Sequence, residues 1–198
     1  MSNTLEYYNN NADSFAAGTK DVDFSEIQNL FLSYLKEGAR ILDFGCGAGR
    51  DTKLFHEKGY AVDAVDGSEK LCAVAREYTG LPVQQMLFSD LSSVDTYDGI
   101  WACASILHVT LEELPDVFCR MIHALRENGI LYASFKYGDG EVHRGERFFS
   151  DFTEETMAQF LQQFPELQTI KMWVTYDVRP GRGEEKWLNM ILQKSIMS

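Results

Sequence analysis

The sequence predicts an α/β fold, a doubly wound and mostly parallel seven-stranded sheet with an antiparallel hairpin at its C-terminal end. Three observations predict it. Short apolar runs alternate with helical patterns, the first such run leads directly into a glycine-rich turn, and the last two β-like stretches are separated by only a short turn. Right-handed crossovers between parallel strands place helices on both faces of such a sheet. A length of 198 residues fits one domain, 1–198.

The first half of the chain supplies three strand patterns and three helical patterns. Apolar residues recur every three or four positions along residues 24–35, which is typical of an amphipathic helix. The helix after the first strand is closed by Gly59. The expected strands are 39–44, 60–66 and 81–88, and the expected helices are 24–35, 49–59 and 68–78.

The second half continues the alternation and then changes character. Residues 114–125 carry the clearest helical stripe, and Gly129 follows it. We expect residues 138–145 to form an irregular surface loop at the mouth of the site. The expected strands are 97–104 and 130–136, a further helix is 153–164, and the hairpin consists of 167–178 and 186–194.

Charge and composition argue against several kinds of partner. The chain has 30 acidic and 18 basic residues and a net charge of −12, whereas nucleic acids and anionic membranes are bound by clusters of Lys and Arg. The N-terminal segment lacks the basic and apolar regions of a signal peptide, and the apolar run 100–109 is too short to span a bilayer. Four widely spaced cysteines without a C-x-x-C pair predict neither a metal site nor a disulfide framework. We therefore expect a cytoplasmic protein, monomeric or homodimeric.

The spacing of the glycine-rich turn in "ILDFGCGAGR" distinguishes between cofactors. The dinucleotide-binding pattern G-x-G-x-x-G requires a third glycine where this chain has Arg50. The pattern present is D-x-G-x-G-x-G, from Asp43 through Gly45 and Gly47 to Gly49. A long Arg50 side chain would also crowd a pyrophosphate at the start of the next helix. A NAD-dependent oxidoreductase is therefore the weaker alternative.

Four segments resemble, in order, the motifs of class I S-adenosylmethionine-dependent methyltransferases: "ILDFGCGAGRDT", "VDAVDGS", "YDGIWACASILHV" and "ALRENGILYASF". The resemblance runs from about Tyr8 to the C-terminus. It implies a Rossmann-like fold, S-adenosylmethionine as methyl donor and S-adenosylhomocysteine as product. The segments "GRDT" and "SILHV" are similar to the tellurite-resistance-like and unassigned small-molecule branch of that family.

The resemblance also implies where the cofactor binds. Gly45, Gly47 and Gly49 let the backbone approach the methionine and ribose parts closely, because glycine has no side chain. Asp66 ends the second strand, where its carboxylate can accept hydrogen bonds from both ribose hydroxyls. The alternative role of Asp66 is to cap the next helix. Asp43 is expected to orient the loop and to attract the ammonium group.

Further cofactor contacts are expected from the turn, the ends of other strands and the N-terminal segment. The segment "MLFSDL" lacks the acidic residue that family members usually place after strand three to hold the adenine amine. Backbone groups and the Phe88 ring are expected to hold adenine instead, while Asp90 is either a late substitute or a solvated turn residue. The additional contacts are Cys46, Gly67, Leu87, Phe88, Ala102 and Tyr8.

Methyl transfer from a sulfonium is an in-line displacement, in which the protein mainly aligns the reacting atoms and excludes water. A base is needed only when the acceptor must lose a proton. His108, just after the fourth strand, is the candidate base, because a neutral imidazole works near pH 7. The alternative is that His108 orients the turn that follows.

A small molecule is the expected methyl acceptor. The chain lacks both the N/D-P-P-Y/W segment and the Pro-Cys nucleophile of enzymes that methylate nucleic-acid bases. His143, Arg144 and Arg147 form a local cationic cluster, which predicts that the substrate carries an anionic group. The alternative for this cluster is surface pairing with Glu141 and Glu146.

Two further hypotheses concern turnover and the N-terminus. A protein of this fold can bind S-adenosylmethionine without transferring its methyl group, and this alternative stays open. Leu5, Tyr8, Ala12 and Phe15 lie at helical spacing, so residues 1–20 are expected to form a lid helix over the cofactor. The alternative is a helix packed permanently on the edge of the sheet.

Overall fold

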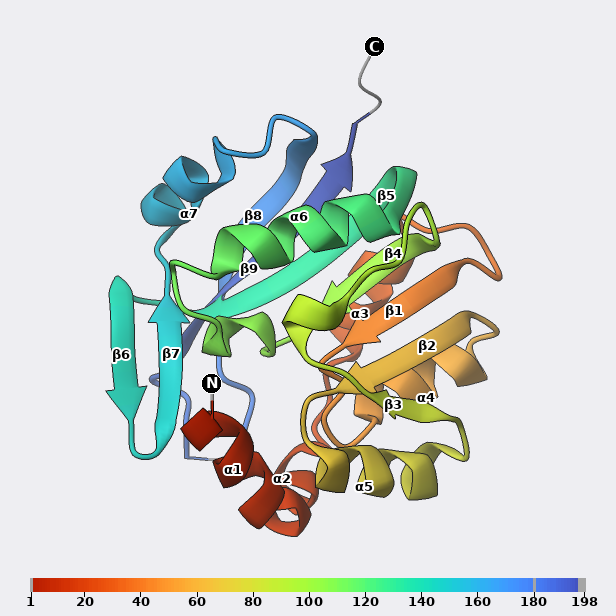
Figure 1. Cartoon of the computed structure of the whole chain (residues 1–198), viewed down its shortest axis with the longest axis vertical. Coiled ribbons are helices and arrows are strands. Elements are labelled where there is room, and N and C mark those ends of the chain that lie inside the picture. Colours follow the sequence, from red (N-terminus) through yellow and green to blue (C-terminus); the bar gives the residue numbers. More distant parts are fainter. Residues whose placement is uncertain (1, 180, 196–198) are drawn as a thin grey trace.

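The computed structural model describes residues 2–179 and 181–195 of the chain. The strands of its main sheet are β1 (Arg40–Phe44), β2 (Ala61–Asp66), β3 (Val83–Gln85), β4 (Tyr97–Ala102), β5 (Leu125–Lys136), β8 (Leu167–Tyr176) and β9 (Lys186–Lys194). Their order across the sheet is β3-β2-β1-β4-β5-β9-β8 (Figure 1). The strands β1 to β5 run parallel, and β9 runs antiparallel to β5 and β8. This confirms the predicted α/β fold with its closing hairpin.

The strand order reverses between β1 and β4. From β1 the chain builds outward through β2 to β3, whereas from β4 it builds in the opposite direction to β5. In open α/β sheets this reversal opens a crevice at the carboxyl ends of the two strands, where ligands bind. The glycine-rich turn begins at this point, directly after Phe44.

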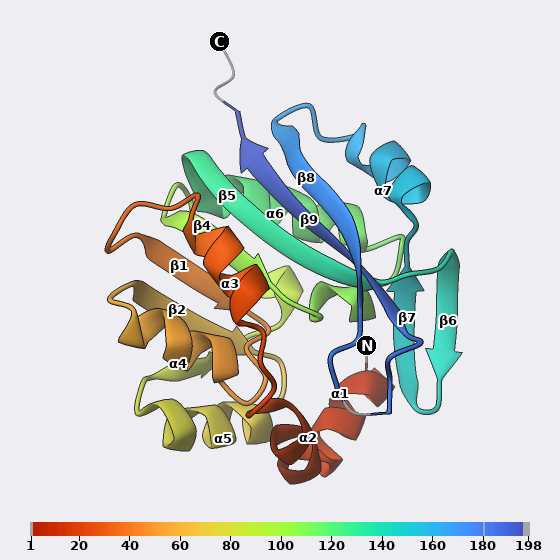
Figure 2. The same cartoon turned by 180° about the vertical axis from the view of Figure 1, so that it is seen from behind.

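Helices cover both faces of the sheet. They are α3 (Ser25–Leu32), α4 (Arg50–Glu57), α5 (Glu69–Thr79), α6 (Leu114–Ala124) and α7 (Glu154–Leu161). The helices α3 and α4 lie on one face and α6 and α7 on the other (Figures 1 and 2). Strand side chains alternate between the faces, so Ile100 of β4 packs with α6 and Trp101 packs with α3.

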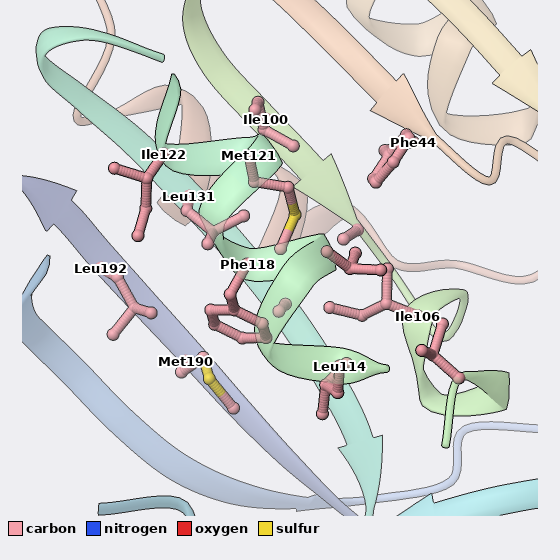
Figure 3. Close-up of a cluster of buried hydrophobic side chains, with 14 of the residues drawn as sticks. Phe44, Ile100, Ile106, Leu114, Phe118, Met121, Ile122, Leu131, Met190 and Leu192 are labelled. Atoms are coloured by element: carbon pink, nitrogen blue, oxygen red, sulfur yellow. The ribbon is translucent and has the colours of Figure 1, made fainter. Parts of the chain in front are cut away.

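The larger core lies between α6 and the sheet. Apolar side chains of the helix meet those of β4, β5 and β9 there (Figure 3). They include Leu114, Phe118, Met121 and Ile122 of α6, Ile100 of β4, Leu131 of β5, and Met190 and Leu192 of β9. On the opposite face the Trp101 ring stacks on Tyr132, with 4.1 Å between centroids. Each such buried side chain contributes about 1.5–3 kcal/mol, so β4 and β5 are held firmly below the crevice.

The N-terminal segment forms two helices where one was expected. The helix α1 (Ser2–Asn10) ends before Asn11, which has a φ of −119° and a ψ of 20°, and α2 (Ala12–Thr19) follows directly. Both helices lie beyond the carboxyl ends of the parallel strands, next to α5 (Figure 1). The apolar stripe predicted for one helix is therefore divided between two.

Residues 138–145 do not form the irregular loop that the sequence predicts. The strands β6 (Gly140–Arg144) and β7 (Arg147–Asp151) pair antiparallel as a second, two-stranded sheet. Gly145, with a φ of +61°, and Glu146 form the two-residue turn between them. Such hairpin turns need positive φ values, which glycine adopts without strain. The hairpin lies beside α1 (Figure 1).

Several boundaries differ from those expected, and α3 and α7 each end about three residues earlier. The strand β3 has only three residues, because the chain soon turns into a 3₁₀ helix, η1 (Phe88–Asp90). The strand β5 begins at Leu125, directly after α6, because Leu125 already pairs with Tyr97 of β4. A second 3₁₀ helix, η2 (Ile106–His108), follows β4.

Candidate functional site

A cavity of about 810 Å³ lies at the carboxyl ends of β1, β2, β4 and β5. The glycine-rich turn and the residues after β2 and β4 line one part of it. Residues of α1, α2, β7 and the segment 175–187 line the rest, so that segments far apart in the sequence meet there (Figure 2). In the described residues, no group of His, Cys, Asp and Glu side chains is arranged to hold a metal ion.

The glycine-rich turn brings backbone atoms to the cavity wall. Gly45 and Cys46 donate their N–H groups to the Val65 carbonyl, both at 2.9 Å, which ties the turn to β2. At Gly45, φ is +88° and a Cβ atom would lie 2.4 Å from Ser105 Cβ. Glycine is therefore required here both by the backbone conformation and by the closeness of the chain after β4.

The next two glycines have different neighbours. Gly47 lines the cavity below α2, where an added Cβ atom would lie 3.2 Å from the Phe15 ring. Gly49 lies outside the cavity lining, and a Cβ atom there would lie 2.7 Å from Thr79 of α5. Gly49 thus lets α4 pack closely against α5 and does not face the ligand space.

Asp66 ends β2 with its carboxylate between the turn and the cavity. Its Oδ2 accepts the Gly47 N–H at 2.9 Å, and its Oδ1 accepts the Ser68 N–H at 2.8 Å. Burial raises the pKa of this carboxyl, and the two N–H groups oppose that shift. The helix cap of α5 is Ser68, whose hydroxyl oxygen accepts the Leu71 N–H. Each Asp66 oxygen therefore keeps a lone pair for a ligand.

Asp43 lies beneath the turn, outside the cavity lining. Its Oδ2 accepts a hydrogen bond from the Thr52 hydroxyl at 2.5 Å, which fastens β1 to α4. Burial, and then the nearby Asp51 carboxylate, raises the pKa of Asp43 to about 8. The carboxyl thus anchors α4 below the turn, and burial favours its protonated form.

Sequence reasoning missed Asp51, a buried residue that lines the cavity. Its two oxygens accept hydrogen bonds from Gln28, Arg50 and the Trp101 indole. The Arg50 guanidinium also lies 4.8 Å from the centroid of the Phe24 ring. Because these partners come from different elements, no local sequence pattern reveals the network.

The part of the cavity next to β3 is apolar. Leu87 and Phe88 line it, and the Phe88 ring packs edge-on against Phe44 at a centroid distance of 4.8 Å. Asp90 lies outside the lining, and its Oδ2 accepts the Leu87 N–H at 3.2 Å. That bond caps η1, so the carboxylate of Asp90 has a structural partner.

Of three other expected cofactor contacts, two line the cavity and one does not. Cys46 and Gly67 line the cavity. Ala102 is fully buried in the core and lies outside the lining. The chain instead presents residues 103–105, which follow β4 and line the cavity. The difference arises because β4 is buried up to its last residue, so only the turn after it reaches the ligand space.

Tyr8 and His108 meet in the cavity. The Tyr8 Oη lies 2.9 Å from His108 Nε2, and His108 Nδ1 lies 2.6 Å from the Phe148 carbonyl oxygen. Because a carbonyl oxygen only accepts, Nδ1 carries the proton and Nε2 accepts from the Tyr8 hydroxyl. Burial lowers the pKa of His108 to about 4, so the ring is neutral at pH 7.

Only two of the three residues in the predicted cationic cluster face the cavity. Arg144 and Arg147 line the cavity, whereas His143 lies outside its lining with its ring against Phe148. Arg144 pairs with Asp151, with 3.0 Å between Nη1 and Oδ1, and not with the glutamates that the sequence suggested.

A charged network, also missed by sequence reasoning, closes the cavity at the end of β5. Lys136 is 7% exposed, and its ammonium bonds to the Asp177 and Glu185 carboxylates above the Trp187 ring. Burial favours a raised pKa for Asp177, but hydrogen bonds from Arg179 outweigh it and hold this pKa well below its usual range. The carboxylates lie 41 and 49 residues from Lys136 along the chain, so no short motif contains them.

The sheet order, the glycine-rich turn after β1 and the carboxylate at the end of β2 together define the class of S-adenosylmethionine-dependent methyltransferases. A family model described as a methyltransferase domain matches residues 41–129. An uncharacterized methyltransferase of Staphylococcus carnosus is 30% identical over 156 residues, which cover 75% of this chain and 74% of that protein. The chain belongs to this methyltransferase family, and S-adenosylmethionine is its methyl donor.

Two other similar proteins act on very different acceptors. The human N-terminal Xaa-Pro-Lys N-methyltransferase 1 is 30% identical over 128 residues, and the match spans 56% of either chain. The structure of a Burkholderia thailandensis 1,6-didemethyltoxoflavin-N1-methyltransferase, with its substrate and S-adenosylhomocysteine, superposes with a TM-score of 0.78. It is 23% identical, and the superposition covers 98% of this chain and 87% of that one, so the likeness is one of fold.

The predictions of fold, family, enzyme class and cofactor are thus confirmed. Among the described helices, none has the length and apolar character needed to cross a membrane. The branch of the family, the cytoplasmic location and the oligomeric state stay predictions.

Proposed function

We propose that this chain transfers the methyl group of S-adenosylmethionine to a small-molecule acceptor, with both bound in one cavity. The observation that carries the proposal is the cavity itself, about 810 Å³ in volume and placed where the strand order reverses. That volume lies within the range of roughly 300–1,000 Å³ typical of small-molecule sites. The glycine-rich turn and Asp66 border one part of it, and Lys136 and Arg147 border another.

The cofactor is proposed to occupy the part between the glycine-rich turn and β3. There the backbone of Gly45 and Gly47 approaches the methionine and ribose portions, and Asp66 accepts hydrogen bonds from the ribose hydroxyls. The apolar side chains of Leu87 and Phe88 enclose the adenine. The remaining proposed contacts are Cys46, Gly67, residues 103–105 and Tyr8.

The helices α1 and α2 are proposed to act as a lid over the bound cofactor. Hydrogen bonds to three other elements hold α1 in place. They are Tyr8 to His108, the Phe148 N–H to Thr4 Oγ1 at 3.1 Å, and the Ser68 hydroxyl and Lys70 N–H to Asn9 Oδ1 at 2.7 and 3.5 Å. They connect α1 to η2, β7 and the start of α5, which surround the ligand space. Breaking these bonds opens the cavity, and remaking them excludes water from the methyl group.

His108 is proposed to position Tyr8 and not to serve as the general base. A base works best when its pKa is near the working pH, and burial places the pKa of His108 at about 4. Its Nε2 already accepts the Tyr8 hydroxyl. A methyl acceptor that is already in its nucleophilic form needs no base, and the chain then contributes alignment and water exclusion.

A peptide acceptor such as that of the human relative is disfavoured by charge. An Xaa-Pro-Lys terminus is cationic. The residues between 134 and 189 that line the cavity include six Lys or Arg and only three Asp or Glu. Repulsion between like charges therefore favours an acceptor without positive charge.

The test is a methyl-transfer screen in which S-adenosylhomocysteine release is measured with small-molecule pools, with peptides and with nucleic acids. Release is expected with a small-molecule pool and is expected to be lost in an Asp66→Ala variant. Tight S-adenosylmethionine binding with no release from any small-molecule pool would contradict methyl transfer to such an acceptor. Release with peptides alone would contradict the proposed acceptor class.

A further inference from the structure

The β6–β7 hairpin brings two arginine side chains to the cavity from directly opposite positions. Arg144 of β6 is the cross-strand partner of Arg147 of β7. Both guanidinium groups lie against the Phe149 ring, at 4.9 and 5.2 Å from its centroid. Like charges in directly opposite positions destabilise a strand pair, so an anion bound to either arginine would reduce this repulsion.

The described residues supply an anion for Arg144 but none for Arg147. The Asp151 side chain is 5% exposed and binds the Arg144 guanidinium through both of its oxygens. Arg147 is half-buried and forms no ion pair with any described Asp or Glu side chain. Its guanidinium instead lies 5.0 Å from the centroid of the Tyr7 ring. Arg147 also acts on the Tyr8 hydroxyl, where its hydrogen bond and its charge oppose the rise in pKa that burial causes. The half-buried guanidinium therefore lies among aromatic rings without a described carboxylate to neutralise its charge.

The charge of the whole cavity wall leads to the same conclusion. The chain has a net charge of −12, yet the residues that line the cavity include seven Lys or Arg and five Asp or Glu. Of the six cations between residues 134 and 189, four pair with carboxylates. This leaves Arg147 and the exposed Lys186 as the two cations of this set without a carboxylate partner among the described residues. The Lys186 ammonium lies 6.0 and 5.7 Å from the centroids of the Tyr137 and Tyr176 rings.

Aromatic rings form much of the wall around this charge. Tyr137 and Tyr176 line the cavity although they are 36% and 60% exposed, and Trp187 lies further in. Phe149 is almost fully buried below the arginines. Exposed ring faces at a cavity are suited to stacking against another planar ring.

We propose that the methyl acceptor is a small aromatic carboxylate, with its carboxylate bound by the Arg147 guanidinium and its ring held among Phe149, Tyr137 and Tyr176. This inference rests on the proposed function, because it assigns the acceptor of the same site. Arginine binds a carboxylate through two parallel N–H···O bonds. One guanidinium balances one negative charge, which suits a carboxylate better than a phosphate monoester with a charge near −2.

The test is calorimetric titration of the S-adenosylhomocysteine complex with paired aromatic probes. The pairs are benzoate and benzamide, 4-hydroxybenzoate and 4-hydroxybenzamide, and indole-3-acetate and indole-3-acetamide, with phenyl phosphate added. The proteins are the wild type, Arg147→Met, Arg147→Lys and Lys171→Met. Lys171 is an exposed residue of β8 outside the cavity lining, so its substitution removes one positive charge elsewhere.

At least one acid is expected to bind the wild type and Lys171→Met about tenfold to a hundredfold more tightly than its amide, as for a charge-assisted hydrogen-bonded pair. Arg147→Met is expected to lose this preference while still binding S-adenosylhomocysteine, and Arg147→Lys is expected to keep part of it. The inference is overturned if amides or phenyl phosphate bind as well as the acids, if no probe binds, or if the preference survives in Arg147→Met. It is also overturned if Arg147→Met binds S-adenosylhomocysteine poorly, because Arg147 then holds the cofactor. Failure of the wild type to bind S-adenosylhomocysteine would instead refute the proposed function.

Discussion

Replacing Asp66 by alanine removes the side chain that is proposed to hold the ribose. The two carboxylate oxygens each accept one backbone N–H, at 2.9 and 2.8 Å, so each has a further lone pair, and the residue lines the cavity. A hydrogen bond to a charged group contributes about 1.5–3 kcal/mol. Loss of two such bonds to the ribose therefore costs about 3 kcal/mol at the lower end, which corresponds to roughly a hundredfold weaker binding.

The assay is calorimetric titration with S-adenosylhomocysteine, with circular dichroism to verify folding. Asp63→Ala is the matched control, because Asp63 lies in the same strand and pairs with Arg40 at a surface position outside the cavity. The control removes the same charge and is expected to bind like the wild type. Wild-type affinity in folded Asp66→Ala protein would refute the assignment of Asp66 to the ribose. An equal loss in the control would mean that overall charge explains the effect.

Three further variants test the surroundings of the site. Tyr8→Phe removes the hydroxyl that donates a hydrogen bond to His108 Nε2, so the free energy of unfolding in urea titrations should fall by about 1 kcal/mol. Hydrogen exchange in α1 should also become faster. Unchanged exchange would show that this hydrogen bond does not hold the lid. Burial lowers the pKa of His108 to about 4, against about 6.5 in the unfolded chain, so the unfolded chain binds the proton first as the pH falls. The free energy of unfolding should therefore drop by about 2–3 kcal/mol between pH 7 and 4.5, and His108→Asn should remove that part of the pH dependence. An identical pH dependence in His108→Asn would contradict the burial of a neutral ring. Asp43→Asn should change the free energy of unfolding at pH 7 by less than about 1 kcal/mol, because a pKa raised to about 8 makes the neutral carboxyl the favoured form there. A large decrease in the free energy of unfolding would mean that Asp43 is ionised.

The sheet and the cofactor side of the site could be predicted because their signals are local. The strand patterns and the glycine-rich turn lie within short windows, and Asp66 stands at a strand end that the pattern marks. Gly49 shows the limit of such reasoning, since its spacing suggests a ligand contact and its neighbour is Thr79 of α5. A motif gives the position of a glycine in the sequence but not which side of its backbone is crowded.

The acceptor side could not be predicted, because it depends on long-range pairing. The sequence predicts an irregular loop over residues 138–145, where the structure has β6. The adjacent Phe148 and Phe149 also break the alternation of apolar and polar residues that would mark β7 as a strand. The Gly145 turn was the one local signal that favoured a hairpin. Whether Arg144 or Arg147 is neutralised depends on Asp151, whose cross-strand partner is Gly140 and which the Arg144 side chain reaches along the hairpin.

The central claim is that S-adenosylmethionine binds where the strand order reverses, against the glycine-rich turn and the end of β2. Hydrogen–deuterium exchange with and without saturating S-adenosylhomocysteine tests it most directly, because the method reports which backbone segments the ligand protects. Slower exchange is expected in residues 45–49 and 66–68, together with α1 if it acts as a lid. Unchanged exchange in residues 45–49 and 66–68 at saturating ligand would contradict the account.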